Sequence, residues 1–166
     1  FLNQLPEGRI VRYLLVSVLF VPVFFAGCVE IGDSDSDPIG GEVVERRPLT
    51  EEETAVWIDQ AECMETESKS RQDIPDLDAT GVPIVSEITI RNNLTCGDAD
   101  PATLVACQSR DEIAFQNGLD PDTFLMALRH EEIHYILFFL TGNGDGNHRS
   151  IWFDLDESPC PETGER

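Results

Sequence analysis

The feature that most constrains the fold is the apolar segment from Asp120 to Gly142, which carries the start and stop signals of a helix. Asp120 suits the N-cap position, and Pro121 follows it where a missing N–H costs nothing. Gly142 supplies the left-handed residue that commonly follows the last turn. The segment between them is apolar on nearly all sides, which is typical of a buried helix. We therefore expect any polar side chain on it to face a crevice inside the protein.

Two histidines, His130 and His134, lie on one face of this predicted helix. Residues four apart in a helix stand one above the other, so both imidazoles can bind one metal ion. Glu131 flanks that face and can act on a water molecule beside the metal without being a ligand. Glu132 is expected to face away from the histidines and either to pair with Arg129 or to cap a neighbouring element. The pattern predicts a metal site with a carboxylate beside it.

The chain contains 3 histidines, and the third, His148, lies in the loop just beyond the predicted helix. A catalytic zinc site uses three protein ligands, so one ligand must come from outside the helix. His148 is the preferred third ligand, because Gly144 and Gly146 let the loop turn back toward the helix. Asp145, in the same loop, is the alternative ligand.

The order His130-Glu131-x-x-His134, followed by His148, resembles the active-site helix and loop of the zincin metallopeptidases. The resemblance covers residues 120–148. It implies an α+β fold, a minimal zincin-like domain in which an N-terminal helix and a small β-sheet accompany a buried active-site helix. It also implies one Zn²⁺ ion as the cofactor.

The resemblance further implies a hydrolase that cleaves peptide bonds in a peptide or protein substrate. In zincins, zinc lowers the pKa of a water molecule and polarises the scissile carbonyl, and the residue matching Glu131 acts as the general base. Arg149 is the candidate for stabilising the oxyanion, because Tyr135 is expected on the opposite face of the helix. An extended substrate would pair with an edge strand, a role for which Ile84–Ile90 is the candidate.

A second helix is predicted earlier in the chain. Thr50 and Glu53 have the spacing of a capping box, with Thr50 at the N-cap. The helix is expected to run to about Met64 and to bury Trp57 in the core. Residues 65–82 are polar and contain Pro and Gly, so they are expected to form a loop.

Two strands are predicted between the helices. Ile84–Ile90 alternates and is rich in β-branched residues, which favours a strand with one buried face. Residues 112–116 predict a second, shorter strand. The stretch 96–107 between them is expected to be a loop.

Residues 1–27 have the pattern of an export signal, in which Arg9 and Arg12 precede a short apolar run. The run ends in small residues before Cys28, which resembles the lipobox of bacterial lipoproteins. That resemblance implies cleavage before Cys28, acylation of this cysteine by chains such as palmitate, and a lipid anchor in the bacterial cell envelope. By the same resemblance, Val29, at a position where an aspartate would favour retention at the inner membrane, implies the outer membrane. A buried core helix or an uncleaved membrane anchor is the alternative interpretation of the apolar run.

Residues 28–49 are predicted to be an acidic, flexible tether that follows the acylated cysteine. The stretch Ile31–Arg47 is rich in Gly, Ser and Asp and poor in large apolar residues, so it is not expected to order itself. Residues 50–166 are then expected to form the zincin-like metallopeptidase domain.

The 5 cysteines include Cys28 and four others within the predicted domain. An even number of domain cysteines in an exported chain predicts two disulfides. Three pairings are possible, and we favour Cys96 with Cys107, which closes a local loop, and Cys63 with Cys160, which joins the first helix to the tail. A zinc site built from all four thiolates is the alternative, although their spacing does not suit it.

The formal net charge of −21 disfavours nucleic acid and anionic lipid as partners. The chain is expected to act as a monomer. Two other functions remain open beside the peptidase. One is a non-catalytic metal-binding or adhesion lipoprotein on a zincin scaffold. The other is a surface-structure lipoprotein in which the histidine pattern is accidental.

Overall fold

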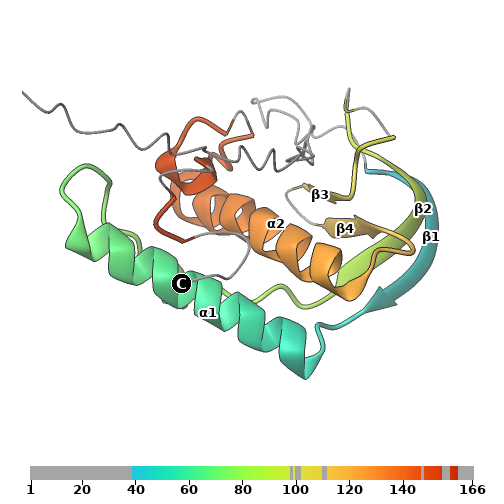
Figure 1. The fold of residues 1–166 in the computed structure, drawn as a ribbon, viewed down its shortest axis with the longest axis horizontal. Coiled ribbons are helices and arrows are strands. Elements are labelled where there is room, and N and C mark those ends of the chain that lie inside the picture. The colour runs from blue at the N-terminus through green and yellow to red at the C-terminus, as the bar shows by residue number, and fades with distance from the viewer. Residues whose placement is uncertain are drawn as a thin grey trace, which may run out of the picture.

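The computed structural model describes residues 39–97, 99, 102–109, 112–146, 148–154 and 158–160. The predicted export signal, the lipidation site Cys28 and the first part of the predicted tether lie outside these residues. Within them, the chain forms two long helices, a mixed four-stranded sheet and two short 3₁₀ helices (Figure 1). The predicted α+β class is therefore confirmed. None of the helices in this described part combines the length and the apolar character needed to cross a bilayer.

Helix α1 (Glu51–Ser70) begins at the predicted capping box. The Thr50 hydroxyl accepts a hydrogen bond from the Glu53 N–H (3.2 Å), and the Glu53 carboxylate accepts one from the Thr50 N–H (2.7 Å). The guanidinium of Arg47 also donates to the Glu53 carboxylate, at 2.6 and 2.7 Å. These hydrogen bonds hold the segment that precedes α1 against the first turn of the helix.

Helix α1 is longer than predicted and passes well beyond Met64. Its last turns are polar, so the spacing of apolar residues could not reveal them. They contain good helix formers, among them Glu65 and Lys69, which form an ion pair on the helix surface. The Glu65 carboxylate also accepts a backbone N–H (2.9 Å) of the 3₁₀ helix η1 (Ala79–Gly81), which lies in the predicted loop.

Helix α2 (Pro121–Thr141) confirms the predicted helix and both of its end signals. The Asp120 carboxylate accepts the N–H of Thr123 (3.0 Å), and Gly142 has φ 76°, in the left-handed region. Figure 1 shows α2 running beside α1, with the strands next to its N-terminal half. The buried residues of α2 are Ala127, Leu128, His130, Glu131, Glu132, Ile133, His134, Ile136 and Leu137.

The sheet contains β1 (Gly40–Arg47), β2 (Ile88–Thr95), β3 (Ala106–Gln108) and β4 (Ile113–Gln116), in the order β1-β2-β4-β3. β2 pairs antiparallel with β1 and parallel with β4, and β3 pairs antiparallel with β4. One core cluster fills the space between the sheet and the two helices. Trp57 belongs to this cluster and is buried, as predicted.

Strand β1 lies where the sequence predicted the end of a flexible tether, so that part of the prediction is wrong. Most β1 side chains are exposed, and the strand is held by backbone pairing with β2. The Arg91 guanidinium adds a hydrogen bond to the carbonyl of Gly41 (2.9 Å). Composition could not reveal this strand, because its order depends on a partner strand far along the chain.

The strand predicted at Ile84–Ile90 is wrong in its bounds and in its position at an edge. The observed strand β2 is Ile88–Thr95, and it lies between β1 and β4. Both of its sides are already paired, so it cannot take up an extended substrate. The edges of the described sheet are β1 and β3, and β3 begins inside the predicted loop 96–107. The second predicted strand, 112–116, corresponds to β4.

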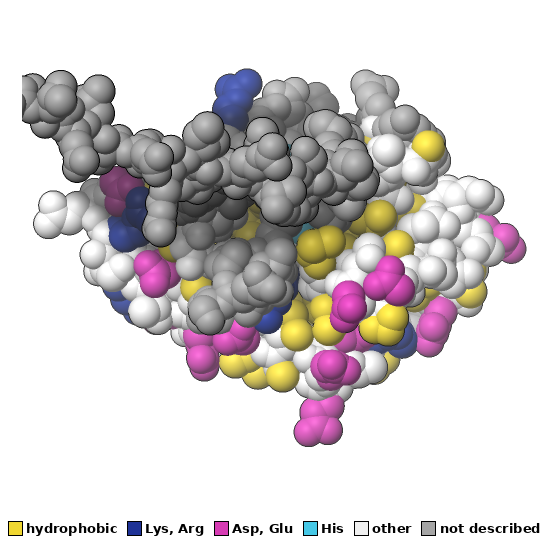
Figure 2. Space-filling view, viewed as in Figure 1, with side chains coloured by type: hydrophobic (Ala, Val, Ile, Leu, Met, Phe, Trp, Pro, Cys, Tyr) yellow, Lys and Arg dark blue, Asp and Glu magenta, His cyan; other side chains and the backbone are white. Residues whose placement is uncertain are grey.

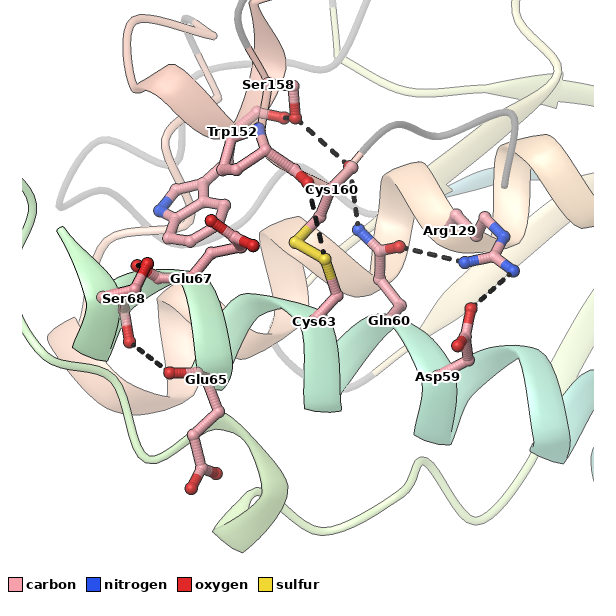
Figure 3. Close-up of a disulfide and its surroundings, with 12 residues drawn as sticks. Asp59, Gln60, Cys63, Glu65, Glu67, Ser68, Arg129, Trp152, Ser158 and Cys160 are labelled. Atoms are coloured by element: carbon pink, nitrogen blue, oxygen red, sulfur yellow. Dashed lines mark hydrogen bonds and ion pairs between the residues drawn. A yellow bond between two sulfur atoms is a disulfide. The ribbon is translucent and has the colours of Figure 1, made fainter. Parts of the chain in front are cut away.

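Both disulfides have the predicted pairing. The Cα atoms are 5.9 Å apart for Cys63 and Cys160, and 6.2 Å apart for Cys96 and Cys107. The first disulfide joins α1 to the C-terminal segment, where it lies close to Trp152 (Figure 3). With all four cysteines paired, a zinc site built from their thiolates is excluded.

Candidate metal centre

The three histidines converge on one point. The Nε2 atom of His134 lies 3.2 Å from Nε2 of His130 and 3.0 Å from Nε2 of His148. One candidate ligand atom from each of the three rings lies within 4.8 Å of the others. Three imidazole nitrogens bound to one tetrahedral zinc ion would be about 3.3 Å apart, given Zn–N distances of 2.0–2.1 Å. The arrangement therefore suits a metal ion at the centre of the three rings.

The local structure explains why two of the rings meet. His130 and His134 are one turn apart on α2, and their exposed fractions are 7% and 2%. Burial, followed by the proximity of His130, lowers the pKa of His134 to about 3. His134 is therefore neutral at physiological pH, which is the form that binds a metal ion.

The orientation of His134 is set by the loop after α2. Its Nδ1 atom lies 2.5 Å from the carbonyl oxygen of Gly144, so Nδ1 carries the proton and donates to this oxygen. Nε2 then keeps its lone pair and faces the other two histidines. A hydrogen bond of this kind to the far nitrogen is the usual way in which a protein orients a histidine ligand.

Asp145 does not join the histidines. Its two carboxylate oxygens accept the backbone N–H groups of Arg149 (3.2 Å) and Ser150 (2.7 Å). Its own carbonyl accepts the N–H of His148 (2.8 Å). The structure thus brings His148, and not the alternative Asp145, to the helical pair.

Phe153 is a site residue that the sequence reasoning missed. Its ring stacks on that of His134, with centroids 4.3 Å apart, and lies 4.6 Å from His148 and 5.2 Å from His130. It belongs to the 3₁₀ helix η2 (Ile151–Phe153) and is buried. A large apolar residue five positions after a loop histidine was the only sequence signal for it.

Glu131 and Arg149, the two predicted catalytic residues, differ in burial. Glu131 follows His130 on α2 and is 2% exposed. Arg149 is exposed, and its backbone N–H is bound to Asp145. The roles of general base and oxyanion stabiliser remain predictions for these two residues.

Glu132 is fully buried on the side of α2 opposite the histidines, and both predicted roles, pairing with Arg129 and capping a neighbour, are wrong. The Arg129 guanidinium instead donates to the side chains of Gln60 (3.0 Å) and Asp59 (3.2 Å) on α1 (Figure 3). Among the described residues, neither Glu132 carboxylate oxygen has a hydrogen-bond partner. Burial therefore raises the pKa of Glu132 well above its ordinary value, although the charge of Arg129 acts against the shift.

No protein-family model matches this chain, and no curated protein or solved structure is significantly similar to it. The geometry of the three histidines, their surroundings and the sequence pattern therefore carry the functional interpretation.

Proposed function

We propose that this protein is a zinc-dependent peptidase with a zincin-like active site on α2. The observation that carries the proposal is the convergence of His130, His134 and His148 beside a buried glutamate, Glu131. Three imidazoles form a ligand set that suits zinc and leaves one position of a tetrahedral ion open. The resemblance of the helix pattern to zincins supports the choice of zinc and of peptide hydrolysis.

The proposed chemistry divides between the cofactor and the chain. When bound, zinc would polarise the scissile carbonyl and make a water molecule more acidic. Glu131 would accept the proton of the attacking water and deliver it to the leaving amine. Arg149, next to His148, would donate to the oxyanion. Phe153 would exclude water from one side of the three histidines.

We assign substrate pairing to β3 in place of the predicted strand Ile84–Ile90. In the described sheet, β3 is an edge strand, and it packs against α2, the helix that carries two of the histidines. An extended peptide could add to this edge by backbone hydrogen bonds. The substrate would then lie beside the helix on which the metal site is built.

We also propose that the protein works outside the cytoplasm, as a monomer anchored to a bacterial envelope membrane by Cys28. The two disulfides support an oxidising compartment. Acidic side chains are scattered over the face shown in Figure 2, in keeping with the net charge of −21, and this disfavours nucleic acid as a partner. The lipid anchor itself is proposed from the sequence pattern.

The test is cleavage of a fluorogenic peptide library by the zinc-loaded mature chain and two variants. Glu131→Gln should keep its zinc and lose cleavage by about 10²–10⁴-fold, because only the proton acceptor is removed. Glu132→Gln is the matched control: it changes the neighbouring acid on the other side of α2 and should keep both zinc and activity. Undiminished cleavage by Glu131→Gln would exclude the proposed mechanism.

One observation favours a second candidate, a non-catalytic metal-binding lipoprotein. Phe153 lies against all three imidazoles, and such an apolar cover is also suited to a closed structural metal site. This candidate predicts one tightly bound zinc ion per chain and no cleavage of any library member by the wild type.

A further inference from the structure

The loop between α2 and η2 is organised by the side chain of Asp145. Its carboxylate accepts the backbone N–H groups of Arg149 and Ser150, the two residues just after His148. Its carbonyl accepts the N–H of His148 itself. One residue therefore receives three consecutive backbone N–H groups and closes the chain around the proposed third ligand.

The backbone at both ends of this turn needs such support. Asp145 has φ 55° and His148 has φ 51°. Both values lie in the left-handed region, which residues other than glycine seldom adopt. Aspartate tolerates this conformation better than most residues, because its side chain can bond to nearby backbone groups. Without those bonds, His148 would be expected to leave this conformation, and its ring would move away from the helical pair.

The same loop is fastened to the end of α2. The Thr141 hydroxyl donates to the carbonyl of Leu137 (2.7 Å) and accepts the N–H of Asn143 (3.1 Å). The Asn143 side-chain oxygen then accepts the N–H of Asp145 (2.8 Å). Between Asn143 and Asp145 lies Gly144, whose carbonyl orients His134. The hydrogen bonds thus run from the helix end to the loop that positions His148 and orients His134.

We propose that Asp145 is the positioning residue for the metal centre: it is not a ligand, and it holds His148 at the distance that a third ligand requires. The inference rests on the proposed metal site and deepens it. Removal of an outer-shell partner of a metal ligand typically lowers metal affinity by about 10–100-fold. We expect that range for Asp145→Ala, because the substitution removes both side-chain bonds and the tolerance of the left-handed backbone.

Two further variants separate the two contributions of Asp145. Asp145→Asn keeps the backbone preference and one acceptor oxygen, and replaces the other oxygen with a donor. Asp145→Gly keeps access to the left-handed conformation and loses both acceptors. Zinc affinity should therefore fall in the order wild type, Asn, Gly, Ala. Asp154→Ala, which removes an exposed acid from the same C-terminal segment, is the charge-matched control and should bind zinc like the wild type.

The experiment measures zinc affinity of the mature chain by chelator competition, and the visible spectrum of the Co²⁺-substituted protein. Asp145→Ala should weaken zinc binding and change the cobalt spectrum toward that of His148→Ala. The double variant Asp145→Ala/His148→Ala should bind no more weakly than His148→Ala alone, because Asp145 acts through His148. Wild-type affinity with an unchanged spectrum in Asp145→Ala, or additive losses in the double variant, would overturn the proposal.

A second measurement keeps this inference distinct from the proposed function. Hydrogen exchange in the metal-free chain reports the Arg149 and Ser150 amides directly, and Asp145→Ala should make both exchange faster. Unchanged exchange at both amides would overturn the positioning role, whatever the metal result. Failure of the wild type to bind zinc would contradict the proposed function, and the exchange rates would still decide whether Asp145 holds this turn.

Discussion

The ring of Phe153 stacks on the imidazole of His134, with centroids 4.3 Å apart and 29° between the ring planes. The contact joins the C-terminal segment to α2 at the point where the three histidines meet. Phe153 also shares a core cluster with Ile133, Leu137 and Cys160. The metal centre and this core cluster therefore pack as one unit. Substitutions in the cluster should then change metal binding.

Phe153→Ala tests that unit. Truncation of a buried Phe typically lowers the free energy of unfolding by about 3–5 kcal/mol. We expect a loss at or below the lower end of that range in the metal-free chain, together with weaker zinc binding, because the rings lose their common contact. Urea unfolding and calorimetric zinc titration measure the two effects. Phe153→Leu should retain most of both, and zinc binding unaffected by Phe153→Ala would show that the contact does not organise the site.

The Cys63–Cys160 disulfide should support metal binding as well as stability. It closes a sequence separation of 97 residues and anchors the segment that carries Phe153 and follows His148. Cys63→Ser/Cys160→Ser should lower the free energy of unfolding by about 2–5 kcal/mol and reduce zinc affinity, because that segment gains freedom. Thermal unfolding and zinc titration of the double variant measure both effects.

The second disulfide offers a matched control. Cys96 and Cys107 are 11 residues apart and belong to a different core cluster, with Ile39 and Leu94. Cys96→Ser/Cys107→Ser should destabilise the chain and leave the zinc affinity of the folded protein unchanged. Equal losses of affinity from both pairs of substitutions would show that the effect is a general loss of stability.

The Glu53 carboxylate predicts a pH dependence of stability. Burial raises its pKa, but the hydrogen bonds from Arg47 and Thr50 outweigh that effect, so the pKa is lowered from 4.5. The folded state therefore binds fewer protons, and the stabilisation is present above pH 4.5 and lost as the pH falls through the lowered pKa. Glu53→Gln should lower the free energy of unfolding by about 1 kcal/mol at pH 7 and by less at pH 3.

Urea unfolding of the metal-free chain at the two pH values measures this difference. Glu52→Gln, an exposed acid in the same first turn, is the control and should have a smaller effect. If Glu53→Gln lowers the free energy of unfolding by the same amount at pH 7 and pH 3, the charge of the Glu53 carboxylate does not stabilise the start of α1.

The parts of the fold that were predictable from sequence are those with local signals. The N-cap and C-cap of α2, the capping box of α1 and the spacing of His130 and His134 all lie within a few turns of chain. The glycines after α2 allowed the loop to bring His148 back to the helix. The even number of cysteines in the domain indicated two disulfides, and the short loop between Cys96 and Cys107 indicated their pairing. These features require no knowledge of distant residues.

The remaining parts depend on contacts between distant segments. Strand β1 is ordered by pairing with β2 and has few buried side chains, so its composition resembled a tether. The bounds of β2 are set by its pairing with two neighbouring strands. The strand therefore begins later in the chain than the apolar, alternating stretch from which it was predicted. Phe153 and Asp145 acquire their positions only when the loop folds back on α2. No periodic pattern in the sequence predicts the role of either residue.

X-ray absorption at the zinc edge, with metal content measured on the same samples, tests the proposed metal centre most directly. We expect one zinc ion per wild-type chain, with about three imidazole nitrogens at ~2.0 Å, and a lower number of imidazoles and weaker retention in His148→Ala. Wild-type protein that retains no stoichiometric zinc, or a coordination shell unchanged by His148→Ala, would contradict a site built from these three histidines.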